Sequence, residues 1–244
     1  MLLADIHFHG LWGVDDGAEN EAETLEMLKK EYLGGTRIIC FTPHYNPDYF
    51  DDYDAVPAYE RFCLIKKRSE TLFPELQLYF GNELCYHSEF AKGLVSGACR
   101  PLGEGNCVLV DFHCNESPYE IERALMQIST TGFTAVLAHA ERYDGVYNDR
   151  RLLESLISKG VYIQVNASSV LSEKKRIVRP LCKLIKQGYV NVIASDAHGA
   201  LERPPLLSEC ADFVGSFLSK QKTEEIFYLT PKEILGINNV TETV

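Results

Sequence analysis

Short apolar runs rich in β-branched residues alternate with longer amphipathic stretches along this 244-residue chain, and this rhythm limits the fold most strongly. The apolar runs predict strands at residues 2–6, 37–41, 76–80, 107–110, 134–137, 161–165 and 190–194. Helical spacing predicts helices at residues 21–33, 58–72, 118–130, 150–159, 174–187, 206–218 and 223–228. Alternating strands and helices indicate βα units and a parallel sheet. We therefore predict an α/β fold. A single domain over residues 1–244 is expected, because no linker or internal repeat divides the chain.

Residues able to bind a metal follow the predicted strands. In chain order they are His7, His9, His44, Glu83, Asp111, His139, Asn166, Asp196 and His198. The carboxyl ends of parallel strands meet on one face of a sheet, so these side chains are expected to converge there. Side chains two residues apart share a face of a strand, so His7 and His9 can hold one ion together. Buried charged groups would be costly at such ends without a metal or a partner.

The types of ligand restrict the metal. Imidazole and carboxylate without thiolate suit Mn²⁺, Fe²⁺ or Zn²⁺, and the eight cysteines of the chain contain no Cys-x-x-Cys pair. The ligands are too many for one ion, so two or three ions are predicted. Clustered divalent ions suit the hydrolysis of a phosphoester, because they lower the pKa of a bridging water and hold the phosphate oxygens.

Charge and composition exclude several other classes of protein. The formal net charge is −11 and the sequence pI is about 5.1, which disfavours nucleic acid and anionic membranes as partners. The first ten residues lack the basic start of a secretory signal, and no apolar run is long enough to span a bilayer. A cytoplasmic location without membrane insertion is therefore expected. The oligomeric state stays open, with a homo-oligomer among the possibilities.

Several motifs occur in order over nearly the whole chain. They are D-I-H-x-H at 5–9, V-D-D-G-A at 14–18, E-T-L-E-M-L at 23–28, T-P-H-Y at 42–45, G-N-E-L at 81–84, A-H-x-E-R-Y at 138–143, Q-x-N-A-S-S at 164–169, S-D-A-H at 195–198 and R-P-P at 203–205. This set resembles the PHP (polymerase and histidinol phosphatase) superfamily. More narrowly, it resembles the bacterial capsule-associated tyrosine phosphatases of the CpsB/YwqE type.

The resemblance implies a distorted seven-stranded (β/α) barrel, similar to a TIM barrel, with a trinuclear site that usually holds Mn²⁺. Fe²⁺, Zn²⁺ and Mg²⁺ are the alternatives. The implied metal ligands are His7, His9, Asp16, His44, Glu83, Asp111, His139, Asp196 and His198. The family places Arg142 and Arg203 on the substrate phosphate. Its usual glutamate is replaced here by Asp111, which is one methylene shorter, and His113 is close enough to be considered as a substitute ligand.

The expected activity is hydrolysis of phosphotyrosine on protein. Other phosphomonoesterases of the superfamily would use the same site chemistry. A metal-activated hydroxide would attack phosphorus while Arg142 and Arg203 stabilise the transition state. Asp196 or His198 could supply a proton to the leaving group. In the aromatic loop, Tyr45 (with Tyr49, Phe50 and Tyr53) could stack on a phenolic ring. None of the cysteines has arginine six residues later, which excludes a cysteine phosphatase.

Two competing functions remain. One is a phosphomonoesterase acting on a small molecule such as histidinol phosphate. The other is a regulatory module with a degenerate site, which the nine intact ligand positions disfavour. The resemblance also implies a partner, the tyrosine-rich tail of a membrane-associated kinase that controls capsule or exopolysaccharide export.

Overall fold

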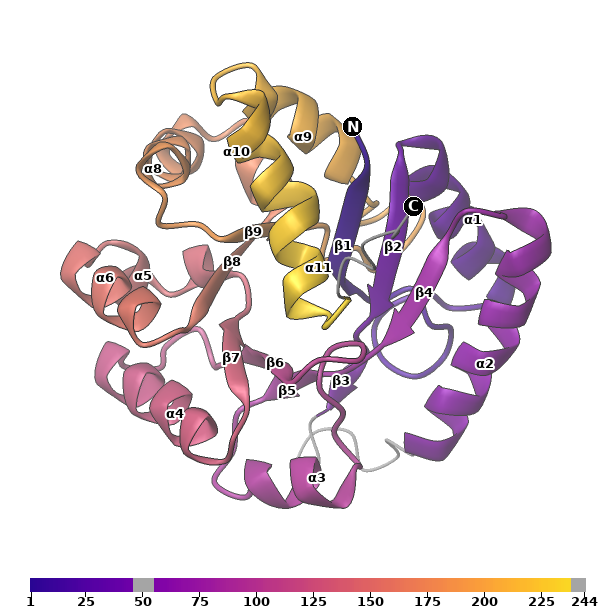
Figure 1. Ribbon diagram of the computed structural model, residues 1–244, viewed down its shortest axis with the longest axis horizontal. Coiled ribbons are helices and arrows are strands. Elements are labelled where there is room, and N and C mark those ends of the chain that lie inside the picture. Colours follow the sequence, from indigo (N-terminus) through magenta and orange to yellow (C-terminus); the bar gives the residue numbers. More distant parts are fainter. Residues whose placement is uncertain (46–54, 238–244) are drawn as a thin grey trace, which may run out of the picture.

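Parallel strands form the centre of the protein, and most of the helices lie outside them (Figure 1). The computed structural model describes residues 1–45 and 55–237. The strands are β1 (Leu3–Phe8), β2 (Thr36–Phe41), β3 (His44–Tyr45), β4 (Gln77–Phe80), β5 (Glu83–Cys85), β6 (Cys107–Asp111), β7 (Thr134–Leu137), β8 (Tyr162–Asn166) and β9 (Val192–Ala194). Every ladder between them is parallel, as the alternating pattern predicted.

The helices follow the strands as expected for βα units. They are α1 (Glu21–Leu33), α2 (Ala55–Leu72), α3 (Phe90–Ser96), α4 (Pro118–Thr130), η1 (Ala140–Arg142), α5 (Asp144–Tyr147), α6 (Arg150–Ser158), α7 (Ala167–Val170), α8 (Lys175–Gln187), α9 (Leu207–Gly215), α10 (Lys220–Glu224), η2 (Glu225–Leu229) and α11 (Thr230–Ile234). Local chemistry sets several ends. The Ser117 side chain accepts a hydrogen bond from Glu120 N and Pro118 opens α4, which is why this helix begins where the sequence predicts.

The ladders form two sheets rather than one closed ring. Their strand orders are β1-β2-β4 and β3-β5-β6-β7-β8-β9. Thr42-Pro43 separates β2 from β3, and Gly81-Asn82 separates β4 from β5, so two strand positions are each split between the sheets. An isolated parallel bridge from Phe8 to Ala197 brings β1 beside the segment after β9. The structure therefore shows an α/β fold with a curled parallel sheet, while the closed seven-stranded barrel stays a prediction.

Three apolar clusters fill the fold. One packs the helices from α4 to α9 onto the strands, and a second packs α1 and α2 onto β1, β2 and β4. The third lies among the strands, where Ala4, Ile6 and Val192 pack with Ile234 and Leu235. The C-terminal segment η2–α11 lies against β1 and runs across the strands in Figure 1. One end of the strands is thus filled by apolar side chains, which leaves the opposite, carboxyl end for polar groups.

Some predicted boundaries were wrong. Strand β1 continues to Phe8, so His7 lies inside the strand rather than beyond it. Helix α3 (Phe90–Ser96) lies between the strands predicted at residues 76–80 and 107–110, where no helix was predicted. The helix predicted at residues 223–228 belongs to a longer helical run from Lys220 to Ile234. The predicted aromatic loop lies largely outside the described residues, which include Tyr45 but not Tyr49, Phe50 or Tyr53.

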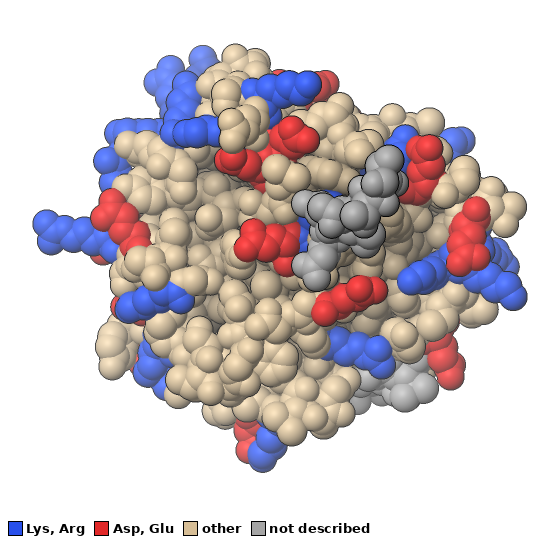
Figure 2. All heavy atoms as spheres, in the orientation of Figure 1, with Lys and Arg blue, Asp and Glu red and all other residues tan. Residues whose placement is uncertain are grey.

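Two features of the described residues concern nucleic acid and membranes, the partners that the net charge disfavours. In the face drawn in Figure 2, lysine and arginine side chains of the described residues alternate with carboxylates around the rim rather than forming one broad basic patch. Among the helices of residues 1–45 and 55–237, none combines the length and the apolar character that crossing a bilayer requires.

The buried carboxyl group of Glu31, on α1, provides a test of how burial affects stability. Its Oε2 accepts a hydrogen bond from Thr36 Oγ1, while Glu31 Oε1 and Asp5 Oδ2 are buried without a hydrogen-bond partner among the described residues. Burial, followed by the charge of Asp5, raises the pKa of Glu31 from 4.5 to about 8. The folded protein therefore keeps this proton where the unfolded chain has lost it.

We expect this group to lower the free energy of unfolding progressively as the pH rises from 4.5 to about 8, by at most ~1.4 kcal/mol per pH unit. Urea denaturation at pH 5.5 and pH 8 should show a smaller loss of stability in Glu31→Gln than in the wild type. Glu26→Gln, on the exposed side of the same helix, is the control. An equal loss in Glu31→Gln and the wild type would contradict the assignment.

Candidate metal centre

The predicted ligands converge at the carboxyl ends of the strands. They form three groups, in each of which one ligand atom per residue lies within 4.8 Å of the others. The groups are His9, Asp16, His44 and His198; His7, His9 and Asp196; and Glu83, Asp111 and His139. All nine residues that the resemblance implied as ligands therefore lie in one region, and His9 belongs to two groups.

Two histidines of β1 and its end meet at the centre of this region. The Nε2 atoms of His7 and His9 are 3.0 Å apart, and each lies 3.2 Å from Glu83 Oε2. All three side chains are essentially inaccessible to solvent. Two imidazole nitrogens and a carboxylate oxygen that face one point form a donor set that a divalent ion fits. This confirms the expected convergence of His7 and His9.

In three of the histidines, the Nδ1 nitrogen contacts a neighbouring acceptor. His7 Nδ1 lies 3.2 Å from Gln164 Oε1, and His9 Nδ1 lies 2.8 Å from Asp15 Oδ2. His198 Nδ1 lies 3.0 Å from the backbone oxygen of Asp196. An acceptor on Nδ1 holds the proton there and directs the lone pair of Nε2 inward, which is how metal-binding histidines are normally oriented.

Electrostatics couple these groups. Burial would raise the pKa of Glu83, but the charges of His7 and His44 hold it well below its usual value. Burial would lower the pKa of His7, but Glu83 and Asp196 raise it to about 9. Burial and the charge of His9 lower the pKa of His198 to about 4. At neutral pH the His198 imidazole is therefore neutral.

Asp111 belongs to the third group. Its Oδ1 lies 3.6 Å from His139 Nε2 and accepts a 2.6 Å hydrogen bond from the Tyr143 hydroxyl. His139 Nε2 also lies 2.9 Å from Glu83 Oε1. His113 is exposed and belongs to none of the three groups found in the described residues. The geometry therefore favours Asp111 over His113 as the candidate ligand, despite its shorter side chain.

Arg142 and Arg203 meet on one carboxylate oxygen. Their Nη2 atoms donate to Asp196 Oδ2 at 2.7 and 3.0 Å, and both side chains remain more than two-fifths exposed. Asn166 Nδ2 donates to the same oxygen at 2.6 Å. Two guanidinium groups beside a candidate metal centre can hold an anion bidentately.

Backbone strain is concentrated at the same place. Among the described residues, the non-glycine residues with positive φ are His139 at 30°, Asp196 at 51° and Arg203 at 53°. Such conformations are uncommon for residues other than glycine, although aspartate and histidine adopt them more readily than most, and they often occur at functional sites.

Tyr45 lies at the edge of this region. Its ring packs toward α3, where a Cβ added to Gly93 would come within 2.7 Å of the Tyr45 hydroxyl oxygen. It also lies near His87, with 6.3 Å between ring centroids. The close packing explains why glycine stands at position 93. The role of Tyr45 in substrate binding stays a prediction.

Sequence reasoning missed the residues that orient the ligands. Asp15 binds His9 and also accepts from His44 N at 3.1 Å. Gln164 Oε1 accepts from His139 N at 2.8 Å. Tyr143 reaches Asp111 from the turn after β7. The i, i+2 spacing of Gln164 and Asn166 at the end of a predicted strand was a usable signal, whereas nothing near Tyr143 in the sequence indicates its partner.

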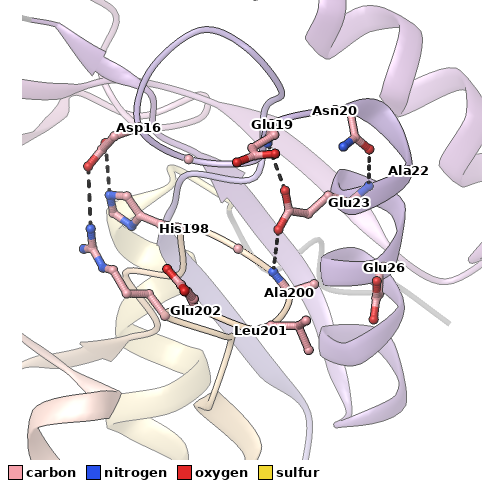
Figure 3. Close-up of a pocket in the computed structure, with 13 residues that line it drawn as sticks. Asp16, Glu19, Asn20, Ala22, Glu23, Glu26, His198, Ala200, Leu201 and Glu202 are labelled. Atoms are coloured by element: carbon pink, nitrogen blue, oxygen red, sulfur yellow. Dashed lines mark hydrogen bonds and ion pairs between the residues drawn. The ribbon is translucent and has the colours of Figure 1, made fainter.

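A cavity of about 630 Å³ opens beside the ligands (Figure 3). Its lining includes Asp16, His198 and Arg203 at one end and the start of α1 at the other. The fold and the site together define an α/β protein with a candidate metal centre at the carboxyl ends of its strands.

Comparison with known families agrees with this class. The sequence model of the family "Capsular polysaccharide synthesis, CpsB/CapC" matches residues 3–236, and the chain belongs to this family. It is 29% identical to the tyrosine-protein phosphatase CpsB of Streptococcus agalactiae over 239 residues, which cover 96% of this chain and 98% of the relative. It is 31% identical to the putative tyrosine-protein phosphatase CapC of Staphylococcus aureus over 209 residues, covering 85% and 81% of the two chains.

The fold is also shared with solved structures. One comes from the crystal structures of YwqE from Bacillus subtilis and CpsB from Streptococcus pneumoniae, which are described as unique metal-dependent tyrosine phosphatases. It matches with a TM-score of 0.85 and 24% identity, over 97% of this chain and 95% of the other. At this identity the likeness concerns the fold.

Asp15 provides a test of how the centre is organised. Replacing it with alanine removes the acceptor on His9 Nδ1, so the imidazole loses its preferred tautomer and orientation. We expect Asp15→Ala to weaken Mn²⁺ binding by about 10- to 100-fold, measured by isothermal titration calorimetry. Glu19→Ala removes an exposed carboxylate from the same loop and should bind Mn²⁺ as the wild type does. Equal affinities for Asp15→Ala and the wild type would show that Asp15 has no such role.

Proposed function

We propose that this chain is a metal-dependent protein-tyrosine phosphatase that helps regulate capsular or exopolysaccharide synthesis. The observation that carries the proposal is the convergence of three histidine–carboxylate groups beside two arginines that share one oxygen of Asp196. Membership of the CpsB/CapC family supports it, as do the relatives named as tyrosine-protein phosphatases. We further propose that residues 1–244 act as one domain.

The proposed metal ligands are the nine residues of the three groups. These residues would hold two or three ions, most simply Mn²⁺. His9 belongs to two of the groups, and the Glu83 carboxylate contacts four of the histidines. Among the described residues, the groups contain histidine and carboxylates but no cysteine, which also accommodates Fe²⁺, Zn²⁺ or Mg²⁺. When bound, such ions supply Lewis-acid chemistry that withdraws charge from phosphoryl oxygens and makes a coordinated water more acidic.

The protein's own groups would bind and orient the phosphate. Arg142 and Arg203 already point their Nη2 atoms at one position, Asp196 Oδ2, so a phosphoryl group entering beside Asp196 meets donors from both. The side-chain amide of Asn166 donates to the same oxygen and helps keep that carboxylate in place. Because charge develops on the phosphoryl oxygens and on the leaving oxygen, fixed guanidinium groups stabilise the transition state.

The proposed substrate is phosphotyrosine on the tail of a membrane-associated kinase. The membership of a capsule-synthesis family supports a partner of this kind. Tyr45, which lies next to the proposed ligand His44, is the proposed contact for the phenolic ring. A phenolate is a good leaving group, so little proton donation is required from Asp196 or His198.

Removal and return of the metal tests the function. Chelated protein should lose hydrolysis of phosphotyrosyl peptide and of p-nitrophenyl phosphate, and Mn²⁺ should restore both. We expect a higher kcat/KM for the peptide than for histidinol phosphate. Recovery on histidinol phosphate alone would keep the metal centre but move the function to a small-molecule phosphatase. Full metal content without turnover of any ester would refute a phosphatase.

Arg142 tests the phosphate site separately. Arg142→Ala should reduce kcat/KM by about 10²- to 10³-fold, as expected when one donor to a developing charge is lost. Arg142→Lys keeps the charge but not the planar pair of donors, and should recover only part of the loss. The metal content of each variant, measured in parallel, shows whether loss of the Arg142–Asp196 hydrogen bond also weakens metal binding. Full activity in Arg142→Ala would remove this residue from the mechanism.

A further inference from the structure

Glu23, the third residue of α1, makes an unusual set of hydrogen bonds at the start of its helix. The Asn20 side chain caps α1 by accepting from Glu23 N at 3.1 Å. In a capping box the carboxylate at this position would return to the N–H of the cap residue itself. Here Glu23 Oε2 instead accepts from Glu19 N at 2.9 Å, and Oε1 accepts from Ala200 N at 3.0 Å (Figure 3). Its carboxylate thus joins two loops that lie far apart in the sequence.

Both loops carry residues of the proposed site. The loop that ends at Glu19 contains Asp16, and the loop through Ala200 connects His198 to Arg203. Asp16 Oδ1 lies 3.3 Å from His198 Nε2, and Asp16 Oδ2 lies 3.7 Å from Arg203 Nη1. The Asp16 side chain is nevertheless 59% exposed. Ion pairs this exposed contribute little on their own, so other contacts must hold the loops in register.

The second loop is tight and closely packed on α1. His198 N donates to Arg203 O at 3.0 Å, which closes the loop, and Arg203 has a φ of 53°. A Cβ at Gly199 would lie 3.0 Å from Glu23 Oε1 and 2.9 Å from Glu202 O, so only glycine lets the backbone approach this closely. Lys30, also on α1, donates to Ala200 O. Helix α1 therefore binds both backbone polar groups of Ala200, in the middle of the loop.

We propose that Glu23 is a positioning residue, which holds Asp16 against His198 and Arg203 by hydrogen-bonding to both loops. The proposal rests on the proposed function, because it assigns these three residues to metal and phosphate binding. Glu23 itself belongs to neither the proposed metal site nor the proposed phosphate site. It acts through the backbone N–H groups of Glu19 and Ala200.

Hydrogen exchange tests the contact without metal or turnover. In metal-free protein, amides in residues 196–206 should exchange at least about tenfold faster in Glu23→Ala than in the wild type, because local opening no longer breaks this bond. Glu26→Ala is the matched control, since Glu26 lies one turn further along α1 and lines the same cavity. Unchanged exchange in Glu23→Ala would overturn the proposal.

Kinetics test the consequence. On phosphotyrosyl peptide, Glu23→Ala should lower kcat/KM by about 10- to 100-fold, the scale expected from small misplacement of catalytic groups. Glu23→Gln keeps one acceptor oxygen and should restore part of both the exchange protection and the activity, whereas Glu26→Ala should match the wild type. An equal loss in Glu26→Ala would indicate a general effect of charge and refute positioning. If Glu23→Ala does not fold, the comparison of Glu23→Gln with Glu26→Gln carries the test.

The two proposals fail in different ways. A wild type that hydrolyses no ester refutes the proposed function, while the exchange measurement still reports whether Glu23 holds the loops. Loosened loops together with unchanged kcat and KM in an active enzyme refute the positioning role and leave the phosphatase assignment standing.

Discussion

The buried carboxylate of Glu83 is the interaction on which the site depends. Its Oε2 lies 3.2 Å from both His7 Nε2 and His9 Nε2 and 3.1 Å from His44 Nδ1, while Oε1 lies 2.9 Å from His139 Nε2. A charge at this depth is costly unless it is paired, and removing its partners would leave it uncompensated. Four histidines from three places in the chain must therefore meet one carboxylate, which constrains how these strands can be arranged. The three places are β1 and the residue after it, β3, and the turn after β7.

The fold keeps apolar and polar side chains apart, in agreement with that constraint. Apolar side chains, including Ile234 and Leu235 from the C-terminal segment, fill the space among the strands. The carboxyl ends collect the polar groups instead, and the acceptors Asp15 and Gln164 keep the imidazoles turned inward. Toward the solvent, the contacts are weaker and more exposed, and hydrogen bonds from α1 hold the loops there.

Much of this could be predicted from local pattern. The strand–helix alternation and the capping of α1 and α4 depend on neighbours in the sequence, and these helices begin as predicted. The candidate ligands were equally readable, because most lie at or near the end of a predicted strand and the motifs, including the one that contains Asp16, resemble a known family. Two features were missed. One is the split of two strand positions, at Thr42-Pro43 and at Gly81-Asn82, and the other is helix α3. The sequence shows no clear periodic signal at any of these places.

The sequence by itself determined the class of fold, the candidate ligands and the absence of a cysteine-phosphatase motif. Strand spacing suffices for the first, the resemblance to a known family supplies the full set of candidate ligands, and the residues that follow each cysteine decide the last. Only the tertiary structure decided which ligands share a group, that Asp111 rather than His113 faces His139, and that Tyr143 and Glu23 support the site. These contacts join residues tens to hundreds of positions apart. Their geometry depends on how strand ends and loops pack in three dimensions, which no local pattern records.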